Sequence, residues 1–118
     1  MLLRGDRRLL TRLGRNLLEN ARRYGGDSSI DVSVQLEDGG AICRIRVEDR
    51  GPGVPEEERE KIFLPFYRRP GTREQGDGVG LGLFLVNRIA LHHKGVVHCG
   101  AREGGGTRFD VFLPIHRE

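Results

Sequence analysis

The sequence is poor in several residues that build small binding sites and membrane spans. It has no tryptophan, one methionine and two cysteines in 118 residues. Neither Cys43 nor Cys99 belongs to a Cys-x-x-Cys pair, which argues against zinc ribbons and redox motifs, so we interpret both as small core residues. No apolar run approaches the roughly 20 residues that span a bilayer, and the N-terminus lacks the apolar stretch of a signal peptide. These absences predict one cytoplasmic domain over residues 1–118.

Lysine is also scarce, and the excess of positive charge is small. The chain has 20 basic and 17 acidic residues, a net charge of +3, and its only lysines are Lys61 and Lys94. No five like charges are contiguous, so a nucleic-acid tail or a polybasic membrane patch is unsupported. We expect no nucleic-acid partner and no direct membrane contact by this domain, although a longer parent protein could be membrane-anchored.

The hydrophobic pattern predicts an α+β fold. Asp6 is a candidate N-cap for a long helix that ends at Gly25 and Gly26, and alternating residues over 30–47 predict a hairpin. A short helix follows Pro55, a loop without periodicity covers about 63–78, a second helix begins near Leu81, and a last hairpin covers 97–115. We expect a two-layer arrangement, with helices packed on one face of a mixed, mostly antiparallel sheet. Residues 1–4 could be the end of a further strand whose start is missing.

The first predicted helix carries an unusual polar edge. Asn16, Asn20 and Tyr24 recur every four residues, with Arg23 beside them. Asparagine is a mediocre helix former, so two of them beside a buried face need partners, and their amide oxygens suit a hard cation such as Mg²⁺. Alternatively, both amides are exposed or cap nearby backbone groups.

Three glycine-rich segments follow along the chain. Asp49, at a predicted strand end before Gly51 and Gly53, could accept a hydrogen bond from an amino group such as that of adenine, or lie in a simple tight turn. Glycines alternate just before the second helix, where free N–H groups can bind an anion, although a flexible hinge has the same pattern. Neither the Walker nor the Rossmann pattern is present. The last turn ends at Thr107, and a simple loop explains it equally well.

Together these segments match one family in order, spacing and identity. The chain resembles the catalytic ATP-binding domain of sensor histidine kinases, which has the Bergerat fold and shares a superfamily with gyrase. The resemblance extends from about Gly5 to Ile115 and rests on an asparagine box at 16–24, glycine boxes at 49–53, 78–83 and 104–109, and a phenylalanine box at 62–68.

The resemblance implies a role for each matching residue. Asn20 would coordinate Mg²⁺ with Asn16 adjacent, and Arg23 and Tyr24 would lie against the nucleotide. Asp49 would bind the adenine amino group, with Thr107 supporting it. The remaining ATP-binding residues implied are Gly51 and Gly53 beside the base, Val54 and Ile62 in its pocket, Tyr67 and Arg68 at the start of a lid, and Gly78, Gly80, Leu81, Gly82 and Leu83 around the phosphates. Asn20 and Arg68 would be the catalytic pair, because Arg68 could neutralise charge on the transferring phosphoryl group.

The chain departs from the superfamily's ATP hydrolases at one position. Those enzymes carry a glutamate four residues before the metal-binding asparagine, where this chain has Asn16, whose amide cannot take a proton. Glu19 does not replace it, because adjacent helical residues point about 100° apart. We therefore expect ATP to be held for transfer rather than hydrolysed.

The phosphate acceptor is expected outside this chain. Its four histidines, His92, His93, His98 and His116, match no phosphoacceptor motif, so we interpret them as structural. The leading hypothesis is an ATP-dependent histidine kinase domain that acts on a histidine of its own dimerisation domain, for relay to a response regulator. A serine-directed kinase of the anti-sigma type and a non-catalytic nucleotide-binding module are the alternatives.

Overall fold

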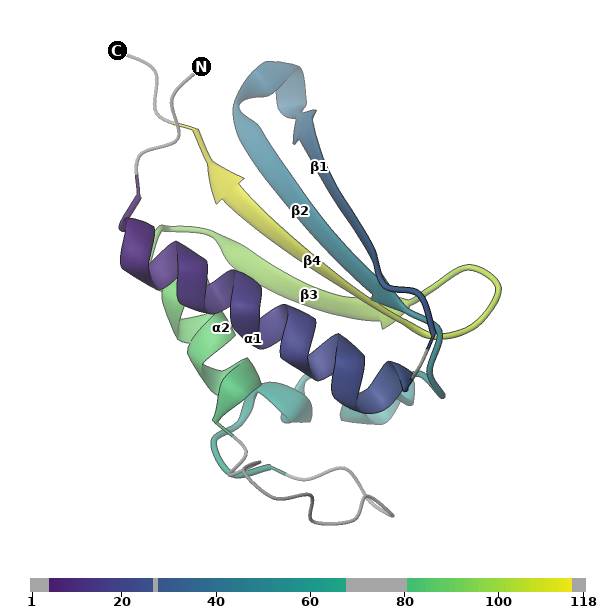
Figure 1. Cartoon of the computed structure of the whole chain (residues 1–118). Coiled ribbons are helices and arrows are strands. Elements are labelled where there is room, and N and C mark those ends of the chain that lie inside the picture. The colour runs from purple at the N-terminus through teal and green to yellow at the C-terminus, as the bar shows by residue number, and fades with distance from the viewer. Residues whose placement is uncertain (1–4, 27, 68–80, 116–118) are drawn as a thin grey trace.

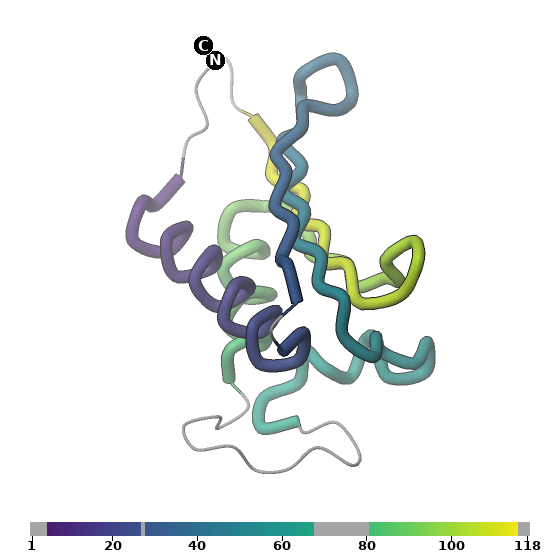
Figure 2. Tube along the Cα trace, turned by 45° about the vertical axis from the view of Figure 1, so that its right-hand side comes forward, coloured from purple at the N-terminus to yellow at the C-terminus, as the bar shows by residue number. Residues whose placement is uncertain are grey.

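Two helices pack on one face of a four-stranded antiparallel sheet in the computed structural model, which describes residues 5–26, 28–67 and 81–115 (Figure 1). The strand order is β1-β2-β4-β3. Figure 2 shows α1 along one side of the molecule, with the strands on the other. The elements are α1 (Arg7–Gly25), β1 (Asp31–Glu37), η1 (Asp38–Gly40), β2 (Ile42–Asp49), η2 (Glu56–Glu58), η3 (Lys61–Phe63), α2 (Gly82–His92), β3 (Val96–Ala101) and β4 (Thr107–Pro114).

This architecture confirms the predicted α+β class and both hairpins. All strand pairs in the described residues are antiparallel, and β2 pairs with β4 at the centre of the sheet. The short helix expected after Pro55 is instead two separate 3₁₀ turns, η2 and η3. Arg68, Gly78 and Gly80 lie outside the described residues. No described helix is long and apolar enough to cross a membrane.

The start of α1 is fixed by a side-chain cap and by a histidine of the other helix. The Asp6 carboxylate accepts the N–H groups of Arg8 and Leu9 at 2.9 and 3.1 Å, as the sequence predicted. The N–H of Asp6 donates to Nε2 of His93 at 2.9 Å, and Nδ1 of the same ring lies 2.8 Å from the carbonyl oxygen of Ile89. Since an accepting Nε2 requires the proton on Nδ1, neutral His93 links the start of α1 to the end of α2.

The core lies between the helices and the inner face of the sheet. Leu13, Leu17 and Ala21 of α1 face Val86, Ile89 and Ala90 of α2, and these six residues pack on Val47, Phe109, Val111 and Leu113. Cys43 and Cys99 are both buried, as expected for small core residues. Burial raises the pKa of the Cys43 thiol, which keeps it protonated and unreactive.

Strand β1 lies at the edge of the sheet, beyond the cover of the helices. Val32, Val34 and Leu36 pair with residues of β2 that face the core, yet they are 54%, 67% and 45% exposed. Their alternation correctly predicted a strand, but it did not predict whether that strand is covered. Within the described part of the chain, nothing shields this apolar edge.

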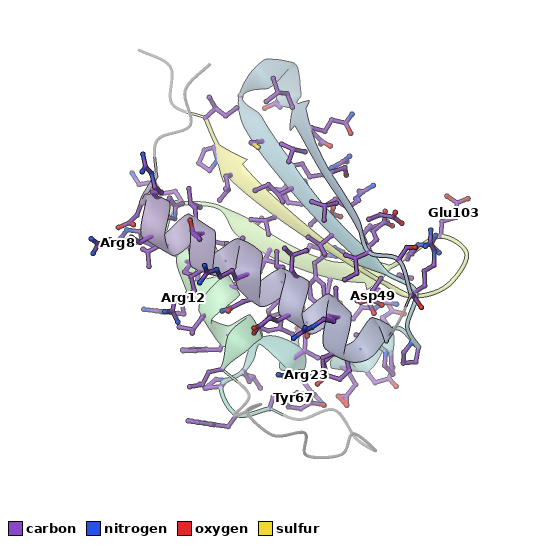
Figure 3. All side chains as sticks on the ribbon, viewed as in Figure 1. Arg8, Arg12, Arg23, Asp49, Tyr67 and Glu103 are labelled. Carbon is purple, nitrogen blue, oxygen red and sulfur yellow. The ribbon has the colours of Figure 1, made fainter. Side chains whose placement is uncertain are left out.

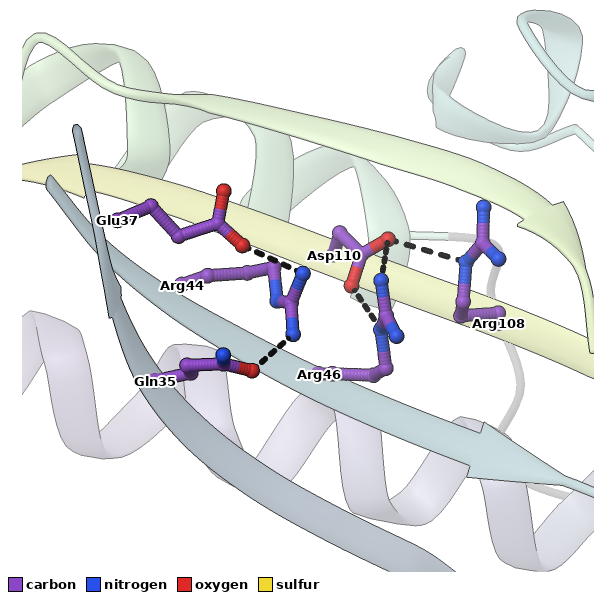
Figure 4. A network of polar contacts seen from close by, with 6 residues as sticks. All are labelled: Gln35, Glu37, Arg44, Arg46, Arg108 and Asp110. Atoms are coloured by element: carbon purple, nitrogen blue, oxygen red, sulfur yellow. Dashed lines mark hydrogen bonds and ion pairs between the residues drawn. The ribbon is translucent and has the colours of Figure 1, made fainter.

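The outer face of the sheet carries a polar network centred on one buried carboxylate (Figure 4). Asp110 accepts from Nε of Arg46 at 2.6 Å and lies 3.0 Å from Nε of Arg108. The hydrogen bond with Asp110 raises the pKa of Arg46. Arg44 pairs with Glu37 alongside, so cross-strand ion pairs hold β1, β2 and β4 in register.

Adjacent leucines of α1 provide a matched test of this packing. Leu17 is fully buried, whereas Leu18 is 44% exposed. We expect Leu17→Ala to lower the free energy of unfolding by about 2 to 5 kcal/mol, because it removes buried methyl groups and leaves a cavity. Leu18→Ala should change it by less than about 1 kcal/mol. Urea titration followed by circular dichroism measures both, and equal losses would contradict the assigned orientation of α1.

Candidate functional site

Three chain segments that are distant in sequence meet at one end of the sheet. They are the last turn of α1, the end of β2 at Asp49 and the start of β4 at Thr107. Asp49 and Thr107 are directly opposite in the β2–β4 register, and a Cβ on Gly25 would lie only 3.0 Å from the Cβ of Asp49. Figure 3 shows Asp49 beside the C-terminal part of α1. The structure thus brings the asparagine box and the first and third glycine boxes together.

Two glycines make this close approach possible. A Cβ on Gly51 would lie 2.3 Å from the carbonyl oxygen of Tyr24. A Cβ on Gly106, whose φ is +118°, would lie 1.9 Å from the carbonyl oxygen of Asp49. Both distances are far inside van der Waals contact, and the second glycine also has a backbone conformation that side chains disfavour. Gly51 was expected to make room for a base, but the structure gives it a second role, which is to let β2 pass the end of α1.

Asp49 is held in one orientation at this junction. Its side chain is 2% exposed, and Oδ1 accepts the N–H of Gly51 at 2.8 Å. A buried carboxylate with a fixed backbone partner is a preorganised acceptor for one further donor. Gly53 follows at φ +81°, and a Cβ there would lie 3.3 Å from the carbonyl oxygen of Gly106.

Two buried polar atoms at the site have no hydrogen-bond partner among the described residues. They are Oγ1 of Thr107, a residue 1% exposed, and Nδ2 of Asn20, a residue 9% exposed. The expected hydroxyl contact from Thr107 to Asp49 is therefore not formed directly, and support through a water stays a prediction. Buried polar groups are nearly always satisfied, so these two orphans, one opposite Asp49 in the sheet and one on α1, fit a site that a polar ligand completes.

The two asparagines of α1 have different surroundings. Nδ2 of Asn16 donates to the carbonyl oxygen of Gly82 at 3.2 Å, which ties α1 to the first residue of α2. Asn16 therefore contacts backbone, one of the two alternatives left open by the sequence. Asn20 is buried and has an orphaned amide, and the assignment of its oxygen and nitrogen is interchangeable, so this amide can present an oxygen to a cation. Glu19 is exposed and lies on another face of the helix.

Most of the remaining expected residues lie on other segments of the described chain. Val54 and Ile62 are 5% and 4% exposed and belong to the core cluster. The Tyr67 hydroxyl donates to the Glu58 carboxylate. Leu81 and Leu83 are half-buried at the start of α2. Between them Gly82 is exposed, with no atom of another described segment within 4 Å of the place a Cβ would take. Arg23 and Tyr24 occupy the last turn of α1.

The sequence did not predict every important residue. Gly25 was interpreted only as a helix stop, and Gly106 had no assigned role, although both sit against Asp49. The sequence pattern that could have identified them is a glycine close to a predicted site residue, and this pattern is too common to predict a close contact. A separate cleft of about 620 Å³, with Phe63, Asn87, Val97 and Cys99 in its lining, was also not foreseen. None of the expected ATP-binding residues lines it, so we do not assign it to the site.

Comparison with known proteins decides the family. The model of the histidine kinase-, DNA gyrase B- and HSP90-like ATPases matches residues 5–117. The chain belongs to this family. Its membership confirms the resemblance to the catalytic domain of sensor histidine kinases and supports ATP as the nucleotide.

Relatives within the family are sensor proteins. The chain is 43% identical to Escherichia coli sensor protein RstB over 111 residues, covering 93% of this chain and 25% of RstB. It is 44% identical to the Pseudomonas aeruginosa sensor kinase PmrB over 103 residues, covering 84% of this chain and 20% of PmrB. The chain thus spans about a quarter or less of the length of these relatives.

The fold agrees with a solved catalytic domain. The mycobacterial sensor histidine kinase MprB superposes with a TM-score of 0.87 at 29% identity, covering 98% of this chain and 78% of that one. The two-layer arrangement predicted from the sequence is therefore that of the family.

The close approach at Gly51 can be tested by one methyl group. We expect Gly51→Ala to lower the melting temperature by several degrees, because the added Cβ would overlap the Tyr24 carbonyl oxygen and push β2 away from α1. The matched control is Pro52→Ala, at an exposed neighbouring position. Differential scanning calorimetry measures both, and a Gly51→Ala protein as stable as the control would refute the packing.

Proposed function

We propose that this domain binds ATP with Mg²⁺ and transfers the γ-phosphoryl group to a histidine on its own dimerisation domain, for relay to a response regulator. Sensor kinases of this family imply two-component signalling, and the specific acceptor and regulator are part of the proposal. We also propose that the domain works in the cytoplasm, where nucleotide is available.

The observation that carries the proposal is the group of buried polar atoms at the sheet end. Asp49 is a fixed acceptor that matches the donor character of the adenine amino group. Asn20 and Thr107 each have a buried polar atom with no protein partner in the described residues. A solved relative, ShkA, was crystallised with AMPPNP at 30% identity and a TM-score of 0.77, which supports a nucleotide in the equivalent fold.

Mg²⁺ fits the donor chemistry of this edge of α1. Asn20 can offer an amide oxygen, and a cation that takes few protein ligands is completed by water and phosphate oxygens. When bound, such an ion would neutralise charge on the phosphates. We keep the roles that the family resemblance implies for two further residues. Asn16 would assist in holding the metal, and Arg68 would be catalytic. Asn16 would act from its contact with Gly82.

Transfer is favoured over hydrolysis because the helix lacks a base at the required position. Asn16 is an amide, and Glu19 is exposed on a different face from buried Asn20. Asp49 lies at this junction, and we assign its carboxylate to the adenine amino group and not to a water molecule at the phosphates. An enzyme that holds ATP without activating water needs an acceptor from another domain.

Labelled ATP and two acceptors test the proposed reaction. We expect label on a histidine-bearing dimerisation domain fused upstream of this chain, and none on a serine-bearing acceptor of the anti-sigma type. Phosphohistidine is lost in acid, whereas phosphoserine survives, so acid treatment identifies the bond. The Asn20→Ala variant is the negative control. Acid-stable label, or no label from a protein that binds ATP, would contradict the histidine assignment.

At Gly82, substitution by alanine is expected to change stability and ATP affinity in opposite directions. Alanine at the helical positions Gly82 and Gly14 would meet no atom of the described residues within 4 Å, so both substitutions should stabilise the fold, by up to about 1 kcal/mol. If phosphates approach the backbone at the start of α2, only Gly82→Ala should weaken ATP binding, by tenfold or more. Calorimetric titration of both variants measures this, and equal affinities would remove Gly82 from the site.

A further inference from the structure

The outer face of α1 carries a line of arginines. Arg8, Arg12, Arg15 and Arg22 fall within an arc of roughly 80° around the helix and extend over about 21 Å of its length. All four are exposed. The exposed Glu19 lies within the same arc, between Arg15 and Arg22 along the helix. Figure 3 shows Arg8 and Arg12 projecting away from the sheet. We call these four residues the arginine stripe.

The positive charge of the stripe is only partly offset by the protein. Within the described part of the chain, none of its four guanidinium groups has an ion-pair or hydrogen-bond partner. Arg8, Arg12 and Arg15 lie three and four residues apart and repel one another, whereas Glu19 offsets part of the charge near Arg15 and Arg22. Arg8 also lies in the first turn of α1, which has no acidic residue and where the helix dipole disfavours a cation. The helix therefore carries an electrostatic cost that an anionic partner would relieve.

Positive charge dominates the whole helical layer. Glu19 is the only acidic residue of α1 and α2, whereas α2 adds exposed Arg88 and the turn after it adds exposed Lys94. The other acidic residues of the described ranges, apart from the Asp6 cap, lie in strands, 3₁₀ turns and loops. The domain is thus polarised, with a basic helical face and its acidic groups elsewhere.

The composition of the exposed face of α1 suits contact with a flat, negatively charged surface better than contact with a protein partner. Protein interfaces have an apolar centre that is rich in aromatic residues and poor in charge. The exposed positions of α1 include no aromatic residue: they hold six arginines together with Thr11, Leu18 and Glu19. A helix presents a convex ridge, which needs a matching groove in a protein but only contact with a surface that is uniformly negative.

The geometry points to the arginine stripe as an electrostatic docking face for a membrane surface that contains anionic phospholipid. The expectation of no direct membrane contact was based on the lack of contiguous basic residues. The helix gathers residues that are three to seven positions apart onto one face, which that criterion does not detect. This docking is independent of ATP binding, because Asn20 lies on the buried side of α1.

Vesicle sedimentation tests the stripe directly. The probe is the 118-residue chain with vesicles of phosphatidylcholine containing 0 or 40% phosphatidylglycerol, at low and physiological salt. We expect binding only to the anionic vesicles, weakened by salt. Each stripe arginine should contribute about fivefold, so the triple variant R8Q/R12Q/R15Q should bind on the order of 100-fold more weakly. Circular dichroism and ATP binding should be unchanged in this variant.

The triple variant R8K/R12K/R15K is the matched control. It keeps the charge but loses the planar fork that arginine offers to carboxylates and phosphates alike, so binding that depends on charge should stay within a few fold of that of the original chain. No binding to anionic vesicles at low salt, or equal binding by the glutamine variant, would overturn the proposal. If the chain instead binds poly-glutamate and does not bind anionic vesicles, the stripe serves an acidic protein and the membrane assignment is wrong.

Discussion

The close contact between the end of β2 and its neighbours is the constraint on which the site depends. Gly51 lies against the carbonyl of Tyr24, and Gly106 lies against the carbonyl of Asp49, at separations that no side chain would permit. These two contacts place the last turn of α1, the end of β2 and the start of β4 around one buried carboxylate. Because Asp49 sits where three segments meet, its orientation is set by backbone packing. Among the described residues, the buried amide nitrogen of Asn20 and the buried hydroxyl of Thr107 have no hydrogen-bond partner.

Much of this arrangement could be predicted from the sequence, because it follows from local signals. The Asp6 cap, the two hairpins and the strand end at Asp49 each have a short pattern with a physical cause. The order of the boxes then identified the family. The role of Gly106, the Asn16 contact with Gly82 and the His93 link to Asp6 could not be predicted, since each joins residues more than 50 positions apart. The exposure of β1 could not be predicted either. Alternation of apolar and polar residues shows which face of a strand is apolar, but not whether another element covers that face.

Helix α1 joins the two functions that we assign to this domain. Its buried side carries Leu13 and Leu17 into the core and presents Asn20 to the site, while its outer side carries the arginine stripe. A domain held to a charged surface by one face of α1 would keep its nucleotide site on the inner side of the same helix. Since α1 is rigidly capped by Asp6 and tied to α2 through His93 and Asn16, the two faces have a fixed relation.

The central claim is that the buried polar group at the end of the sheet binds ATP with a cation. Calorimetric titration of ATP into the purified chain, with Mg²⁺ and again with a chelator, tests it most directly. The account predicts micromolar binding that Mg²⁺ strengthens, with the gain from Mg²⁺ absent in an Asn20→Ala variant that still binds ATP without metal. A folded protein that binds no ATP, or binds it equally with and without Mg²⁺, would contradict the assignment of Asn20 and of the site as a whole.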